Sequence, residues 1–364
     1  MATKQLAEEL SLRHEVHVLT TGFKDFPLEE EVNGVRIHRV YVIGRRCLPT
    51  ATIMSMVTFV PTAFIRGCRL LLRLKFDVIN AQFVLPSGVP AAMLSKLFSI
   101  PFVLSFIGGD VYDPTKGVSP HRHIILRATI RAISSLAKKR TAISEDTKRR
   151  AQELHGVRKD IIVTPIGLPP TRVPKATREF LKLPPDKLVF VSVGRLISRK
   201  GYETLLSAWR YVDNAYLVIV GSGHLYDKLK KIISSQELKD RVRLAGFVSE
   251  ERKVQILNSA DGYISAAEHE GFGIVFLEAM EAGLPIVATN EGGQLDFLED
   301  EVNALLVPPA KPKTLAAAIN RLANDPVLRQ QISENNKNKV KDYYLNKTTA
   351  LFERVLLEAA DKKK

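Results

Sequence analysis

Two cations, Arg195 and Lys200, stand in a glycine-bounded turn in the second half of the chain, between Gly194 and Gly201. The turn directly follows Leu188–Val193, an apolar run typical of a buried β-strand. In open α/β sheets, ligands bind beyond the carboxyl ends of the strands. Cations and free backbone N–H groups at such a place suit a diphosphate. The alternative is a surface turn whose charges only help solubility, and these residues alone do not decide between the two.

Two carboxylates follow the next predicted strand, Gly262–Ser265. Glu270 lies in the loop, and Glu278 lies about two turns inside the helix that the loop opens. Gly271 and Gly273 allow backbone N–H groups at the helix start to approach a ligand, and the helix dipole favours an anion there. Ionised carboxylates accept hydrogen bonds from pairs of hydroxyl groups, as sugars and ribose offer. The alternative, that Glu278 is only a partly exposed residue of the helix, is disfavoured because its neighbours along the helix are apolar.

A third glycine-rich turn contains Gly292 and Gly293 and follows the predicted strand Pro285–Ala288. A single Gly-Gly pair is weak evidence for a site. Three such turns after three strands of one domain are stronger evidence, because parallel strands end at the same edge of a sheet. We expect all three turns to line one crevice.

Apolar runs alternate with helical patterns along almost the whole chain, which predicts parallel strands covered on both faces. In the first half the predicted strands are Val16–Thr20, Ile37–Val42, Val78–Ala81, Phe102–Phe106, Arg140–Ile143 and Ile161–Thr164. In the second half they are Leu188–Val193, Tyr216–Val220, Val242–Leu244, Gly262–Ser265, Pro285–Ala288 and Ala304–Val307. The predicted helices of the first half are Leu48–Leu74, Ser87–Phe98, His121–Ala137 and Glu145–Leu154. Two such series predict an α/β protein with two doubly wound domains.

The domain boundary falls at a proline-dense stretch, since residues 165–170 and the polar segment after them have the composition of a linker. We predict an N-terminal domain over residues 1–168 and a second domain over 169–342. The remaining residues, 343–364, are helical in pattern. A chain of 364 residues is also too long for one compact core.

Charge and cysteine content limit the partners and the compartment. The net charge is +14, and residues 1–170 hold 24 Lys and Arg against 14 Asp and Glu. A basic first half suits an anionic partner such as a lipid surface or a phosphate-bearing acceptor, although general solubility accounts for it equally well. Two cysteines, Cys47 and Cys68, are too few for a disulfide framework and suit a reducing cytoplasm. No His, Cys and Asp cluster has metal-ligand spacing.

The most apolar long stretch is Ile53–Leu74, which contains Pro61, Gly67 and three arginines. A membrane-spanning helix needs roughly 20 uninterrupted apolar residues, so we reject a transmembrane segment. Two interpretations stay open: a helix packed on a sheet, or an amphipathic helix whose apolar face touches lipid.

Three stretches, GRLISRKG, EHEGFGIVFLEAMEAGLPIVAT and EGGQLDFLEDEVNALLVPP, resemble the donor domain of glycosyltransferase family 4. The resemblance covers nearly the whole chain and is most specific across Gly194–Pro309. It implies the GT-B fold, in which two Rossmann-like domains face each other across a cleft. It also implies a retaining transferase that uses a nucleoside-diphosphate sugar and needs no metal or other cofactor, with the leaving phosphate deprotonating the acceptor.

The resemblance assigns roles to the residues singled out above. Arg195 and Lys200 would hold the donor diphosphate and stabilise its departure, and Glu270 would contact the donor sugar. Glu278 would contact the ribose. Backbone N–H groups would meet the phosphates and the sugar, so the expected donor-binding set is Gly194, Gly271, Phe272, Gly273, Ile274, Glu278, Gly292 and Gly293.

On the acceptor side, Gly108, Gly109 and Asp110 match the family's loop in the N-terminal domain. Ile107 stands where many relatives carry a histidine, so that contact is absent or is supplied elsewhere. Ile166 likewise replaces an asparagine common before the linker glycine. The C-terminal helix, roughly Tyr343–Ala359, would cross back to the N-terminal domain.

The start of the chain departs from the family, because relatives begin with a strand and a glycine-rich loop before their first helix. Residues 1–12 read as that helix already. We therefore expect that the chain is incomplete or that its start codon is misplaced.

These features predict a retaining glycosyltransferase acting on a glycan, lipid or small-molecule acceptor. A UDP-sugar is the preferred donor, with GDP second. The enzyme would be cytoplasmic, with a possible peripheral position on the inner face of the membrane and a lipid-linked or membrane-proximal acceptor. Two alternatives stay open: a non-catalytic sugar-nucleotide-binding subunit and a nucleotide-sugar epimerase. Nucleic acid is disfavoured as a partner, since only 7% of residues are aromatic.

Overall fold

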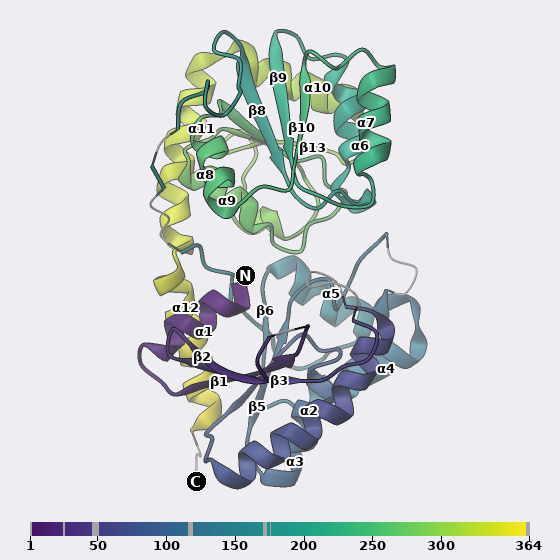
Figure 1. Cartoon of the computed structure of the whole chain (residues 1–364), viewed down its shortest axis with the longest axis vertical. Helices are drawn as coiled ribbons and strands as arrows, with labels where there is room; N and C mark the ends of the chain where they lie inside the picture. The colour runs from purple at the N-terminus through teal and green to yellow at the C-terminus, as the bar shows by residue number, and fades with distance from the viewer. Residues whose placement is uncertain are drawn as a thin grey trace. The chain divides into compact units, whose positions relative to one another are not determined.

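The computed structural model describes residues 2–24, 26–45, 51–115, 119–169, 173–174 and 176–361. Two compact units divide the chain: Met1–Pro169 with Leu345–Lys364, and Pro170–Tyr344 (Figure 1). The corresponding expectations placed the boundaries after residues 168 and 342. Cys47, the predicted helix start at residues 48–50, and part of the proposed linker lie outside the described residues.

The second unit is built on a six-stranded parallel sheet with the order β10-β9-β8-β11-β12-β13. Its strands are β8 Leu188–Val193, β9 Ala215–Val220, β10 Val242–Gly246, β11 Gly262–Ile264, β12 Ile286–Thr289 and β13 Leu305–Val307. In chain order this is the 3-2-1-4-5-6 arrangement of doubly wound folds, and the strand order reverses between β8 and β11. The fold therefore directs the carboxyl ends of β8 and β11 towards the place where such folds bind ligands.

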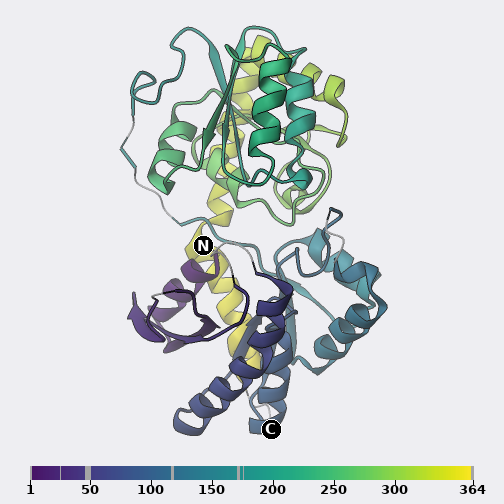
Figure 2. The same ribbon diagram turned by 45° about the vertical axis from the view of Figure 1, so that its right-hand side comes forward.

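Helices cover both faces of this sheet (Figure 2). They are α6 Tyr202–Trp209, α7 Tyr226–Ser235, α8 Glu250–Asn258, α9 Ile274–Glu281, α10 Pro312–Asn324 and α11 Pro326–Lys339, with short 3₁₀ turns η2 Ser198–Lys200, η3 Gly293–Asp296 and η4 Val340–Tyr343. The core centres on Phe190 of β8 and Trp209 of α6, whose rings pack edge to face with centroids 6.1 Å apart. Both side chains are fully buried.

The described residues of the first unit form two separate sheets, whereas the pattern of the first half predicted one parallel series. The smaller has the order β1-β3-β2, formed by β1 Val16–Thr21, β2 Glu29–Val32 and β3 Val35–Val40. The larger has the order β4-β5-β6-β7, formed by β4 Ile79–Gln82, β5 Phe102–Phe106, β6 Lys139–Ala142 and β7 Ile162–Val163.

Strand β2 was missed, and it pairs with β3 in antiparallel fashion. The turn between them is Asn33-Gly34, and both residues have positive φ, at 50° and 78°. Asn-Gly is the commonest signal for the two-residue hairpin turn that demands such angles. The predicted strand Ile37–Val42 was accordingly placed too late, since β3 begins at Val35, next to the turn.

The helices of the first unit are α1 Ala2–Ser11, α2 Ile53–Arg73, α3 Gly88–Phe98, α4 Ile124–Leu136, α5 Glu145–His155 and α12 Leu345–Ala360, with the 3₁₀ turn η1 Pro120–Arg122. Helix α2 begins at Ile53, later than the predicted Leu48, because Thr52 caps it and forms a capping box with Ser55. Helix α12 belongs to this unit, and Arg13 and Glu353 join it to the segment after α1 at 3.0 Å.

We predict that Gly167→Ala destabilises the first unit. A β-carbon at residue 167 would lie 2.2 Å from Thr348 Oγ1 and 2.6 Å from the Cα atom of Leu345, so the backbone that starts α12 would have to move. Overpacking of this kind costs about 1–3 kcal/mol. Calorimetry should show a lower unfolding temperature. Gly109→Ala is the control, because no atom lies within 4 Å of its new β-carbon; equal melting of both variants would contradict the prediction.

Candidate functional site

The site predicted from three glycine-rich turns forms at the carboxyl ends of three neighbouring strands of the second unit. Gly194 follows β8, Glu270 follows β11, and Gly292 follows β12, and these strands are adjacent in the sheet. Glu270 and Gly292 form a parallel β-bridge, and the N–H of Gly293 donates to the carbonyl of Glu270 at 2.7 Å. The turns after β11 and β12 are therefore fastened together by their backbones.

Lys200 and Glu270 form a partly buried ion pair, with side chains 17% and 12% exposed, that joins the turn after β8 to the turn after β11. Arg199 lies on the same carboxylate, 3.7 Å from Oε1, and its guanidinium also donates to the carbonyl of His269. Burial by itself raises the pKa of Glu270, but the charges of Lys200 and Arg199 outweigh it and lower the pKa to about 2. Glu270 is thus an anion held between two cations. Arg199 was not singled out from the sequence.

Two glycines are required by the close approach of these turns. Gly201 has φ 63°, and a β-carbon there would lie 1.9 Å from the carbonyl oxygen of Ala266. Gly292 has φ 118°, and a β-carbon there would lie 2.3 Å from the carbonyl oxygen of Glu270. Both positions need backbone angles that side-chain-bearing residues rarely adopt. These glycines let the loops meet closely enough for Lys200 to reach Glu270.

Helix α9 starts immediately beyond Glu270, with Gly273 as its left-handed N-cap at φ 86°. Phe272 is buried and packs its ring edge to face on Phe297, with centroids 5.3 Å apart, which fixes the turn. The first N–H groups of any helix have no partner within the helix. At α9 the N–H of Phe276 already donates to the carbonyl of Gly273 at 2.9 Å, so the groups concerned are those of Ile274 and Val275, at the positive end of the helix dipole.

Glu278 lies inside α9 and pairs with Lys253 of α8 at 2.8 Å, while Lys253 also pairs with Glu250 at 2.6 Å. Burial raises the pKa of Glu278, and Lys253 partly offsets that effect. The pKa of Lys253 is raised, because its two carboxylate partners outweigh the effect of its own burial. Lys253 was missed by sequence reasoning, since no motif marks it and only the packing of α8 on α9 brings it to Glu278.

Arg195 has an exposed side chain in the turn after β8. The structure therefore brings Gly194, Lys200, Glu270, the start of α9 and Gly292 together, with Arg195 at the surface of the same turn and Glu278 farther along α9. The roles of these residues stay predictions.

In the first unit, Asp110 is buried and holds two strand-end loops together. Its carboxylate accepts from the N–H of Val84 at 2.7 Å and from the N–H of Ile107 at 2.9 Å. Burial raises the pKa of Asp110 to about 6, although the backbone N–H groups act in the opposite direction. Gly108 has φ 90°, so the loop of Gly108, Gly109 and Asp110 turns sharply at this point. The acceptor role predicted for this loop stays a prediction, and Asp110 would serve it by positioning backbone.

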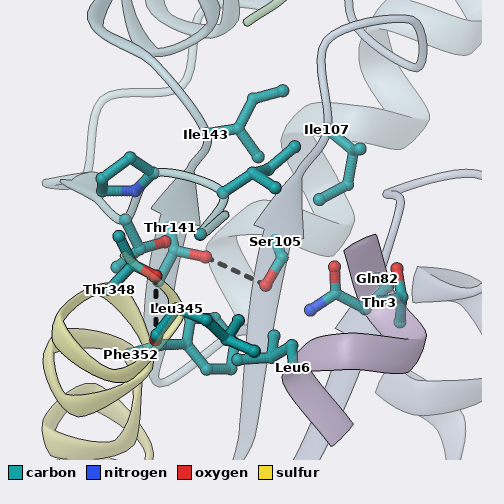
Figure 3. A pocket seen from close by; sticks show the side chains of 14 residues that line it. Thr3, Leu6, Gln82, Ser105, Ile107, Thr141, Ile143, Leu345, Thr348 and Phe352 are labelled. Carbon is teal, nitrogen blue, oxygen red and sulfur yellow. Dashed lines mark hydrogen bonds between the residues drawn. The ribbon is translucent and has the colours of Figure 1, made fainter. Parts of the chain in front are cut away.

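A small pocket of about 50 Å³ lies beyond the ends of β5 and β6 in the first unit, between α1 and α12 (Figure 3). Ile107 lines it, as does a pair of hydroxyls in which Thr141 donates to Ser105 at 2.9 Å. A volume of this size admits water but is too small for a sugar nucleotide.

Both halves of the chain match known protein families. The model for glycosyl transferases group 1 matches residues 174–339, and the model for the glycosyl transferase 4-like domain matches residues 1–167. The chain is 28% identical over 361 residues to an uncharacterized glycosyltransferase of Methanocaldococcus jannaschii, covering 94% of this chain and 89% of the relative.

Solved structures share the fold. The sucrose-phosphate synthase of Thermosynechococcus elongatus superposes with a TM-score of 0.86 at 22% identity, covering 99% of this chain and 93% of that chain. Anabaena HepE, solved in complex with UDP, gives a TM-score of 0.79 at 18% identity, covering 98% and 96%. The architecture is thus the GT-B fold of two Rossmann-like domains, as the resemblance implied.

We predict that the pair formed by Glu270 stabilises the fold in a pH-dependent way. Because its pKa is lowered from 4.5 to about 2, the ionised form stabilises the folded state fully above pH about 4.5, and this stabilisation is lost as the pH falls towards 2. Denaturant unfolding of wild type and Glu270→Gln should differ by about 2 kcal/mol near neutral pH, with the gap closing in acid. A gap that stays constant down to pH 3 would contradict the assignment.

We also predict coupling between Glu278 and Lys253. Each single change, Glu278→Gln or Lys253→Met, leaves a partly buried charge with fewer partners, whereas the double change removes both charges. A double-mutant cycle in denaturant should give a coupling free energy of about 1–3 kcal/mol. Purely additive effects would show that the pair contributes nothing to the fold.

Proposed function

The chain belongs to the group 1 glycosyl transferases, with a glycosyl transferase 4-like first half, and from this we propose that it is a retaining hexosyltransferase. It would move a sugar from a nucleoside-diphosphate donor to a glycan, lipid or small-molecule acceptor. The observation that carries the proposal is the partly buried group of Lys200, Arg199 and Glu270 at the point where the strand order of the second unit reverses.

Lys200, Arg195 and the start of α9 would bind the donor diphosphate. An ammonium group has three donors, so Lys200 can keep its hydrogen bond to Glu270 while it donates to a phosphate oxygen. Arg195 adds a second cation from the same turn, and unpaired N–H groups at the helix start add fixed dipoles. All of these favour the extra negative charge on the leaving diphosphate, which is the charge that grows in the transition state.

The two glutamates would bind the hydroxyl groups of the donor. Glu270 stays ionised because of its cations, and it can accept hydrogen bonds from sugar hydroxyls beside the reacting carbon. Glu278, held by Lys253 in α9, would accept from the ribose. In the reaction the bond from the anomeric carbon to the phosphate oxygen breaks, and a bond to the acceptor oxygen forms. The acceptor proton passes to the leaving phosphate, so the proposal needs neither a metal nor a protein nucleophile.

Uridine is the proposed base and guanosine the second choice. HepE, which shares the fold, was solved with UDP, and this makes UDP the first ligand to try. We propose a cytoplasmic enzyme whose acceptor is lipid-linked or close to a membrane. The loop that Asp110 positions would contribute to the acceptor side.

We predict that one nucleoside diphosphate, UDP before GDP or ADP, raises the melting temperature of the chain. A ligand that binds only the folded state at about 100 times its Kd adds about 2.7 kcal/mol of stability. Lys200→Ala should lose this shift, because the phosphates lose the ammonium group that would bind them. Lys231→Ala, which removes an exposed lysine of α7, is the matched control and should keep the shift.

Kinetic measurements distinguish the role proposed for Lys200 in turnover from the role proposed for Glu278 in nucleotide binding. Lys200→Ala should lower kcat/KM for donor turnover by about 100-fold or more, whereas Glu278→Ala should weaken nucleotide binding by about tenfold, the usual worth of one hydrogen bond to a charged group. Wild-type behaviour of both variants would overturn the site assignment. Nucleotide binding without turnover on any donor and acceptor pair would instead indicate a non-catalytic binding subunit.

A further inference from the structure

Helix α2 presents a continuous apolar stripe to solvent along its length. The exposed members are Met54, Val57, Ile65 and Leu72, at 57%, 62%, 52% and 76% exposure, with Pro61 between them. Their spacing places them on one face of a helix about 30 Å long. The opposite face is buried through residues four apart, namely Ser55, Phe59, Ala63 and Gly67. One face of α2 is thus covered by the protein, and the other is apolar and not covered by any described part of the chain.

The flank of this stripe is basic. Arg69 and Arg73 are exposed, lie one turn apart and make no ion pair with any described residue. Arg66, farther round the helix, is already paired with Glu29. Helix α2 contains no acidic residue at all. Two unpaired guanidinium groups beside an apolar stripe form the pattern of a helix that lies in a membrane interface.

The segments beside α2 also present exposed apolar residues, and α3 adds an exposed lysine. Helix α3 packs beside α2 (Figure 2), since Gly67 approaches Leu94 so closely that a β-carbon would lie 2.4 Å from it. The exposed residues of α3 include Met93, Leu97 and Lys96. At the other end of α2, the N–H of Ile43 donates to Thr58 at 3.0 Å, so the exposed side chain of Ile43 adjoins the first turns.

The charge of the whole chain is concentrated in this region. Residues 32–144 hold 16 Lys and Arg against three Asp and Glu, a net charge of +13 out of a total of +14. Helices α2, α3 and α4 all lie in this segment and contain no Asp or Glu. Self-association of such a face would bring like charges together, whereas an anionic surface would neutralise them.

Helix α2 is long and apolar enough to cross a membrane by length and composition. It nevertheless packs on the core of the first unit, since Phe59 and Ala63 are buried against Val40 of β3. Crossing a bilayer would pull these side chains out of the core. Lying flat in the interface keeps the core intact and covers the exposed stripe.

We propose that the outer face of α2, with its flank of Arg69 and Arg73, docks the first unit on the surface of an anionic lipid bilayer. The stripe enters the boundary between headgroups and acyl chains, and the arginines contact lipid phosphates. The ligand of this face is the bilayer itself, so docking goes beyond donor binding and does not depend on turnover.

The test is co-sedimentation of the full chain with large vesicles, made either of phosphatidylcholine alone or of equal amounts of phosphatidylcholine and phosphatidylglycerol. We expect strong binding to the mixed vesicles that falls as the ionic strength is raised. Val57→Glu with Leu72→Glu should lower the partition coefficient at least tenfold, since two charges enter the apolar boundary. Arg69→Gln with Arg73→Gln should lower it about 30-fold, or about fivefold for each arginine.

Matched controls lie in the second unit. Val327→Glu changes an equally exposed apolar residue of α11, at 75% exposure, and Lys230→Gln with Lys231→Gln removes two exposed cations of α7. Both controls should bind like wild type, and circular dichroism should show that every variant is folded. Failure of the folded wild type to bind mixed vesicles would overturn the proposal, as would equal binding to both kinds of vesicle. Concentration-dependent dimers that Val57→Glu abolishes, without vesicle binding, would assign the face to a second copy of the chain.

Discussion

The partly buried ion pair between Lys200 and Glu270 is the interaction on which the second unit's site depends. It joins the turn after β8 to the turn after β11, the two strands between which the sheet order reverses. Burial by itself raises the pKa of this carboxylate, but Lys200 and Arg199 outweigh that effect and the pKa falls to about 2. The same contact therefore fixes the geometry of the loops and sets the charge that a donor sugar would meet.

The residues around this ion pair allow its loops to approach one another. Gly201 and Gly292 allow backbones to approach where no β-carbon fits, and the N–H of Gly293 fastens the third loop to Glu270. Helix α9 begins at the same edge of the sheet, with Gly273 as its N-cap, and Lys253 pairs with Glu278 farther along this helix at 2.8 Å. Positive charge and fixed dipoles thus lie at one edge of the sheet, an arrangement suited to stabilising a departing diphosphate.

Much of this could be predicted from the sequence, because apolar strand runs and glycine-bounded turns are local signals. The strands of the second unit were predicted to within two residues of their observed ends. What failed depended on contacts between distant residues. The sequence of a single strand does not predict that the first unit divides into two sheets. The pairing of Lys253 with Glu278 likewise depends on the packing of α8 on α9. Strand β2 is different, since the Asn33-Gly34 turn was a local signal that could have been used.

The measurement that tests the central claim most directly is a crystal structure of the full chain with UDP. The proposal predicts the diphosphate within hydrogen-bonding distance of Lys200 and of the N–H groups at Gly273 and Ile274, with the ribose hydroxyls on Glu278. A nucleotide bound away from the ends of β8 and β11, with the pair of Lys200 and Glu270 closed and untouched, would contradict it.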